Sequence, residues 1–70
     1  MEFLVVRFPR SRRTLIDDEY NGRTNELIEL EAGTHAIGLG PPANFTPESR
    51  KIVLRNTSAL EPREVVFDEA

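Results

Sequence analysis

The segment Arg13–Leu39 constrains the fold most, because its apolar residues come in short runs that turn-forming residues separate. The runs cover Thr14–Asp17, Glu26–Glu31 and His35–Leu39. Asn21 and Gly22 lie between the first two runs, and both tolerate the positive φ that a tight turn requires. Gly33 ends the second run. Because each run is too short for a stable helix, the segment predicts three short β-strands.

The rest of the chain has the same pattern. Glu2–Phe8 is rich in β-branched and aromatic residues, and two later runs cover Lys51–Arg55 and Glu64–Asp68. Glycines and prolines exclude a helix or a central strand from Gly40–Ser49. We therefore predict an all-β fold, a small, mostly antiparallel β-sandwich of about six or seven short strands. The side chains expected to point inward are Phe3, Val5, Leu15, Ile28, Leu30, Ile37, Leu39, Ile52, Leu54, Val65 and Phe67.

Seventy residues allow a single domain, which we place at residues 1–70. A chain of this size buries only ~60% of the surface that its unfolded form exposes, so its hydrophobic core is thin. It has no cysteine, and so neither a disulfide nor a thiolate nucleophile. Phe3–Val6 is too short for a signal peptide or a membrane span. We expect a cytoplasmic protein from the sequence as written, or an envelope protein if the domain was excised from a larger exported chain.

Charge is distributed unevenly along the chain. The first residues are basic, with Arg7, Arg10, Arg12 and Arg13, whereas Asp17–Glu31 contains six carboxylates and one arginine. The net charge of −3 opposes non-specific binding to nucleic acid. A local arginine patch is nevertheless compatible with that net charge.

Two stretches resemble the PEGA domain, a small bacterial and archaeal β-sandwich module. Leu15–Thr24 is similar to its strand–Asp–turn–Gly–Lys/Arg–Thr pattern, and Leu30–Ile37 to its Leu-Pro-x-Gly-x-His-x-Val corner. Arg50–Leu54 would be the next strand, so the match covers about Leu15–Leu54; Pro9–Arg12 stands where the family has its Pro-Glu-Gly-Ala signature. The resemblance implies a non-enzymatic module of the kind appended to surface, envelope and signalling proteins. It brings no catalytic or cofactor-binding residues.

Few residues are candidates for catalysis or metal binding. His35, the only histidine, could be a general base or a metal ligand, but a metal needs several converging ligands. In the acidic cluster Asp17-Asp18-Glu19, three adjacent acids cannot all point at one ion. Aspartate in a turn instead commonly accepts hydrogen bonds from its own backbone. No nucleophile or phosphate-binding motif accompanies these residues, so we predict no enzymatic activity, no metal and no cofactor.

Three features are candidates for binding a partner. Phe45 lies in the proline-rich loop Pro41–Ser49, where it is either an exposed aromatic anchor or a lid on the core. Tyr20 is a second aromatic candidate. Met1–Phe8 and Glu64–Phe67 are expected to be edge strands, which bind partners by adding a strand. The arginines near Phe3 and Phe8, namely Arg10, Arg12 and Arg13, either grip phosphates or keep an edge strand from pairing with another chain.

These features predict a non-catalytic structural or protein-interaction module. It would bind through a sheet edge or through the Pro41–Ser49 loop, and its partner would be another protein or a second copy of the same chain. One alternative is a carbohydrate or cell-envelope binding module, for which Tyr20 is the only tyrosine and no tryptophan is available as a platform. The other alternative is weak nucleic-acid binding through the N-terminal arginine cluster.

Overall fold

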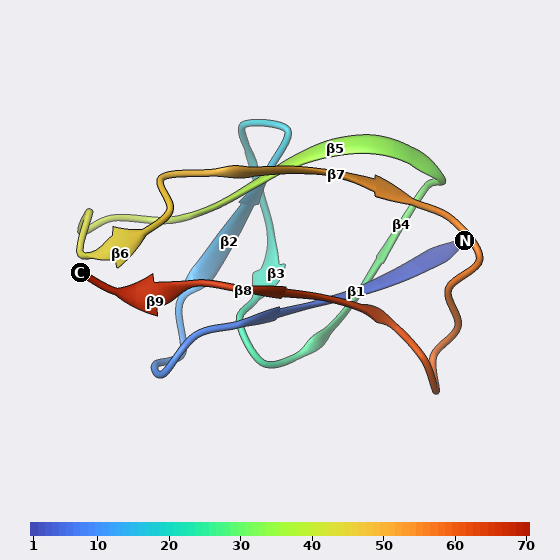
Figure 1. Cartoon of the computed structure of the whole chain (residues 1–70), viewed down its shortest axis with the longest axis horizontal. Coiled ribbons are helices and arrows are strands. Elements are labelled where there is room, and N and C mark those ends of the chain that lie inside the picture. The colour runs from blue at the N-terminus through green and yellow to red at the C-terminus, as the bar shows by residue number, and fades with distance from the viewer.

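The computed structural model describes all 70 residues, Met1–Ala70, and consists of strands without any helix (Figure 1). The strands are β1 Glu2–Arg7, β2 Arg13–Ile16, β3 Glu19–Arg23, β4 Leu27–Leu30, β5 Gly33–Leu39, β6 Phe45–Thr46, β7 Arg50–Leu54, β8 Arg63–Val66 and β9 Asp68–Glu69. The predicted all-β class is confirmed. Three strands were not predicted from the sequence: the two-residue strands β6 and β9, and the five-residue strand β3. No helix is present that could cross a lipid bilayer.

Seven strands form two sheets with the orders β4-β1-β8 and β3-β2-β5-β7, while β6 and β9 pair with each other. All pairs are antiparallel except β1 with β8, which are parallel. The two sheets pack on each other as a small sandwich-like fold (Figure 1). β1 lies between β4 and β8, so the prediction that Met1–Phe8 is an edge strand is wrong. β8 is an edge strand as predicted.

The core is one cluster of twelve buried apolar side chains between the sheets. They are Leu4, Val6, Phe8, Ile16, Ile28, Leu30, Ile37, Leu39, Ile52, Leu54, Val65 and Phe67. Full burial of one such side chain contributes roughly 1.5–3 kcal/mol, which has to offset the entropy of ordering the chain. Eight of the residues predicted to point inward belong to this cluster.

The predicted orientation of the first two strands is wrong. In β1 the core contains Leu4 and Val6, whereas Phe3 is half-buried and Val5 is buried outside the core cluster. In β2 the core contains Ile16, and Leu15 is half-buried. The second inward-pointing residue of β2 is Thr14, which is polar. Its burial is tolerated because its hydroxyl donates a hydrogen bond to the Asn21 carbonyl.

The turn between β2 and β3 lies at Asp17-Asp18, four residues before the predicted position at Asn21-Gly22. Asp17 and Asp18 have φ of 55° and 67°, as a two-residue hairpin turn between paired Ile16 and Glu19 requires. Gly22, with φ of 72°, lies inside β3 at a β-bulge. A Cβ at Gly22 would come within 2.8 Å of Ile28 Cγ1, so glycine is needed there for space as well as for its backbone conformation.

The connection after β3 is hydrogen-bonded to the connection after β1. The buried Thr24 hydroxyl donates to the Arg10 carbonyl at 2.7 Å and accepts the Arg12 N–H at 2.9 Å. The Asn25 side-chain amide donates to the Phe8 carbonyl at 2.8 Å. These bonds satisfy the backbone groups that the two loops would otherwise leave unpaired, and they fix how the two sheets meet on that side.

Candidate binding face

Two edge strands lie on the same face of the molecule. β7 is the last strand of the four-stranded sheet and β8 is the last strand of the three-stranded sheet, and neither pairs with the other. Figure 1 shows them on the side turned to the viewer, with β7 above β8 and the two running in opposite directions. We call this side, bounded by β7 and β8, the open face. On it, the outer edges of β7 and β8 have no strand partner.

Each of these edge strands carries a half-exposed valine. Val53 in β7 is 51% exposed and Val66 in β8 is 50% exposed. Alternation of side chains along a strand explains this. Val53 lies between Ile52 and Leu54, and Val66 follows Val65; because these neighbours point into the core, the two valines point outward. An unpaired strand edge with an exposed apolar side chain is a ready site for another strand.

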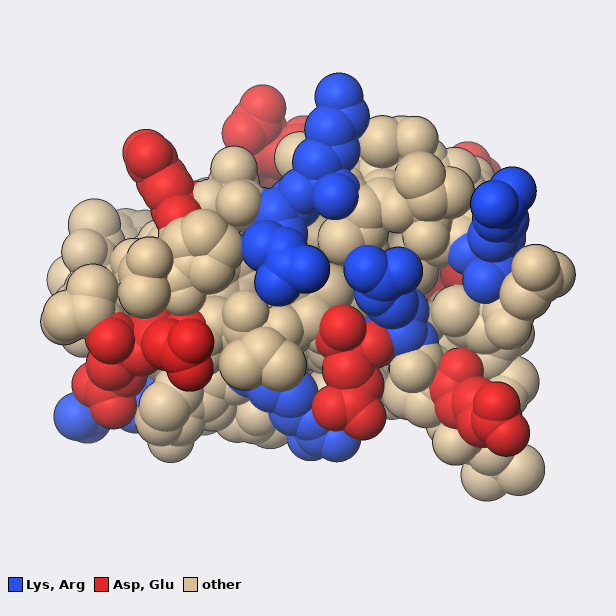
Figure 2. All heavy atoms as spheres, viewed as in Figure 1, with Lys and Arg blue, Asp and Glu red and all other residues tan.

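The charges on the open face are separated. β7 and the residue after it supply Arg50, Lys51 and Arg55, all exposed and none in an ion pair. Along β8 and β9 the exposed charged residues are one cation, Arg63, and the acids Glu61, Glu64, Asp68 and Glu69, of which Glu64 and Glu69 pair with Arg7 and Arg10. Figure 2 shows basic side chains over the middle and right of the upper part and acidic side chains across the lower part, with further acidic side chains at the upper left and basic ones along the lower margin. The open face is therefore basic along one edge and mainly acidic along the other.

The N-terminal arginines are engaged separately. Arg12 Nη1 donates to the Pro42 carbonyl at 2.9 Å and to Asn44 Oδ1 at 2.7 Å, and its guanidinium lies 5.2 Å from the centre of the Phe8 ring. Arg10 pairs with Glu69 at 3.2 Å. Arg13 stacks on the Tyr20 ring at 4.1 Å. The predicted cluster of Arg10, Arg12 and Arg13 is thus divided among three different contacts.

Phe45 is a lid on the core. Its half-buried ring packs edge-on against Phe67 at 5.9 Å and Phe8 at 6.5 Å between ring centres. The loop that carries it is held by Arg12 and by the Ala70 N–H, which donates to the Asn44 carbonyl at 3.0 Å. Phe45 is therefore half-buried as the lid alternative expects, and its role as an aromatic anchor for a partner stays a prediction.

Tyr20 is exposed, as its proposed binding role requires. Its side chain is 49% exposed, and Tyr20 is paired with Leu15 of β2. Arg13 covers part of the ring, and a Cβ at Gly40 would come within 3.1 Å of Tyr20 Cε1. Tyr20 is thus fixed beside Gly40, and Arg13 occupies part of the ring surface that a sugar platform would need.

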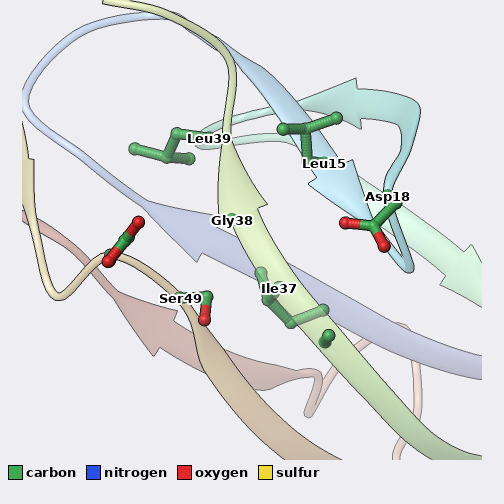
Figure 3. A pocket seen from close by; sticks show the side chains of 8 residues that line it. Leu15, Asp18, Ile37, Gly38, Leu39 and Ser49 are labelled. Atoms are coloured by element: carbon green, nitrogen blue, oxygen red, sulfur yellow. The ribbon is translucent and has the colours of Figure 1, made fainter. Parts of the chain in front are cut away.

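A shallow pocket opens where β5 separates from β7 (Figure 3). β5 pairs with β2 as far as Leu39, but its pairing with β7 ends at Ile37. The pocket has a volume of about 250 Å³ and is lined by Leu15, Asp18, Ala36, Ile37, Gly38, Leu39, Glu48 and Ser49. The sequence did not predict this pocket, because its position depends on where a pairing of distant strands ends.

His35 connects two turns. Its Nδ1 lies 2.7 Å from Asp17 Oδ2 and its Nε2 lies 2.7 Å from the Glu31 carbonyl, while Asp17 Oδ1 accepts the Ala36 N–H. The hydrogen bond to Asp17 and that to Glu31 raise the pKa of His35. The bonds from Ala36 and His35 lower the pKa of Asp17. No three His, Cys, Asp or Glu side chains gather where they could hold a metal ion. The His35 ring thus links the β2–β3 turn to Glu31, the residue after β4.

Comparison with models of protein families, with curated proteins and with solved structures gave no match. The resemblance to the PEGA domain therefore stays a prediction, and the function has to be argued from the surface of the molecule.

Proposed function

We propose that this chain is a non-catalytic protein-interaction module that binds an extended segment of a partner by strand addition on the open face. One observation carries the proposal: two unpaired edge strands lie on one face, and each presents a half-exposed valine.

Strand addition suits the chemistry of these edges. The outward N–H and C=O groups of β7 and β8 can form main-chain hydrogen bonds with an extended segment, while alternate side chains determine which segment is accepted. Each such bond contributes about 0.5–1.5 kcal/mol net, so a strand as short as β7 gives modest affinity unless side chains add to it. Lys51 and Val53 lie on the same face of β7, two residues apart, so they favour a segment with an acidic and an apolar residue two positions apart.

The other candidate sites have less in their favour. The Pro41–Ser49 loop has its aromatic ring packed on the core. The arginines proposed for nucleic-acid binding are bound to a loop carbonyl, a carboxylate and an aromatic ring. The Tyr20 ring proposed for carbohydrate binding is partly covered by Arg13. The sheet edge is the remaining candidate whose binding groups are unpaired.

A peptide-display selection tests the proposal. The chain would be used to select from a library of extended peptides, and a selected peptide would be titrated into isotope-labelled chain while amide chemical shifts are recorded. We expect selected sequences to place an acidic residue two positions from an apolar one and the shifts to change along β7 or β8. Shift changes confined to residues 41–49, to Arg10–Arg13 or to Tyr20 would contradict the proposal.

A pair of matched variants makes this test sharper. Val53→Ser removes the apolar contact from β7, and Leu60→Ser removes a side chain that is 94% exposed but belongs to no strand. We expect Val53→Ser to weaken peptide binding several-fold and Leu60→Ser to leave it unchanged. The opposite order would indicate a hydrophobic contact unrelated to the strand edge.

A further inference from the structure

We propose that the partner on the open face is the open face of a second copy, with β7 of each copy pairing with β8 of the other. This inference rests on the proposed function, since it uses the same strand edges. It specifies a two-fold symmetric dimer.

The topology allows both junctions to form at once. A two-fold axis parallel to the strands brings the four-stranded sheet of one copy level with the three-stranded sheet of the other. The strand order across each junction is then β3-β2-β5-β7 followed by β8-β1-β4 of the second copy. Because this rotation preserves strand direction, and β7 and β8 run in opposite directions, each junction is antiparallel (Figure 1). The dimer therefore leaves neither open-face edge unpaired.

The side chains of the two edges complement each other. β7 turns Lys51 and Val53 outward, and β8 turns Glu64 and Val66 outward. In an antiparallel junction the register that sets Val53 opposite Val66 also sets Arg55 opposite Glu64, so a valine meets a valine and a cation meets an anion. The charge distribution over the whole open face agrees with this pairing, because the mainly basic β7 edge of one copy would meet the mainly acidic β8 edge of the other.

The size of the molecule limits such a dimer to a weak one. Its Cα atoms extend 31 × 21 Å in the plane of Figure 1. Twice the product of these extents is about 1,300 Å², so an interface within this outline lies at or below the lower end of the roughly 1,200–2,000 Å² of specific interfaces. Association should therefore depend on protein concentration and, because exposed charges contribute, on salt.

Sedimentation velocity with charge-reversed variants tests the dimer. One variant, R50E/K51E, makes both edges acidic, and the other, E61K/E64K, makes both edges basic. We expect the wild-type mass to rise from 8.0 kDa towards twice that value with concentration at low salt, and each variant alone to stay monomeric. An equimolar mixture of the two variants should dimerise again, because every junction in the mixed dimer joins an acidic edge to a basic one. Loss of the exposed Arg7–Glu64 ion pair should affect folding little.

The control variant E26K/E29K changes the net charge by the same amount and sign as E61K/E64K, and by the same amount but the opposite sign as R50E/K51E, at positions away from the open face; it should dimerise like wild type. If R50E/K51E leaves the dimer intact and E26K/E29K disrupts it, the interface lies elsewhere and the inference is overturned. So would a chain that stays monomeric at all concentrations. In that case peptide binding at β7, measured on the monomer, decides separately whether the proposed function survives.

Discussion

At the scale of single residues, the pair of His35 and Asp17 makes stability depend on pH. The imidazole is 13% exposed and both of its nitrogens face acceptors, an arrangement that only the doubly protonated ring satisfies. Because the pKa of His35 is raised in the folded state, its contribution is complete below its ordinary value of 6.5 and is lost as the pH rises through the raised value. The pKa of Asp17 is lowered, so its contribution holds above its ordinary 3.8 and disappears in stronger acid.

We therefore expect His35→Gln to destabilise the protein most between about pH 4 and pH 6.5 and progressively less at higher pH. Urea unfolding of wild type and variant across this range measures the difference. A proton NMR titration of the His35 ring should give a pKa above 6.5 in the folded protein. A difference in the free energy of unfolding that does not change with pH would mean that the imidazole is held by packing rather than by its charge.

The buried Thr24 hydroxyl is a second single group on which stability should depend. Replacing it with valine keeps the shape but leaves the Arg10 carbonyl and the Arg12 N–H without their partner. We expect Thr24→Val to lower the free energy of unfolding by about 1–3 kcal/mol. Thr34→Val, at an exposed position of β5, should change it by less than about 0.5 kcal/mol. Equal effects of the two substitutions in urea unfolding would contradict a specific role of the Thr24 hydroxyl.

At the scale of elements, the sequence predicts where most strands lie but not how they pair. Gly33 and the prolines interrupt the apolar runs, which is enough to locate strands. The orientation of β1 is ambiguous because Phe3–Val6 is apolar at every position, so either alternation fits. The β2–β3 turn is equally ambiguous, since both Asp17-Asp18 and Asn21-Gly22 accept a positive φ. The pairing of Ile16 with Glu19 places the turn at Asp17, which also bonds to His35 and Ala36 of the neighbouring strand β5, 18 and 19 residues further along the chain.

The candidate site was predictable to a similar degree. The sequence indicates that β8 could be an edge strand, but an edge is defined by the order of strands in a sheet. That order includes the parallel pairing of β1 with β8, between the two ends of the chain, which leaves no local pattern in the sequence. The exposed position of Tyr20 was anticipated, whereas that of Val53 follows only once β7 is known to be an edge.

The Phe45 ring joins the proline-rich loop to the core, so the stability of the fold should depend on it. Removing the ring by Phe45→Ala should lower the free energy of unfolding by about 1–3 kcal/mol, less than for a fully buried phenylalanine. Phe45→Leu should retain most of that stability. Neither variant should alter peptide binding or sedimentation. If Phe45→Ala unfolds like wild type and loses peptide binding, Phe45 is an anchor and its description as a lid is wrong.

At the scale of the whole molecule, a thin core and self-association are linked. Twelve side chains form the only core of a 70-residue chain, and domains of this size are typically stable by no more than ~3–5 kcal/mol. Any partner that binds only the folded state adds to this stability by mass action. A second copy paired along β7 and β8 is such a partner, so the folded state should become more stable as protein concentration rises.

The melting temperature should therefore depend on concentration. Well above the dissociation constant, a tenfold rise in concentration adds about 0.7 kcal/mol per chain, which for a domain of this size corresponds to roughly 3–5 °C. Differential scanning fluorimetry or circular dichroism at low salt measures this shift. R50E/K51E should melt at the same temperature at every concentration, and the mixture with E61K/E64K should recover the dependence. A wild-type melting temperature that is constant across concentrations would show that the open face adds nothing to the stability of the fold.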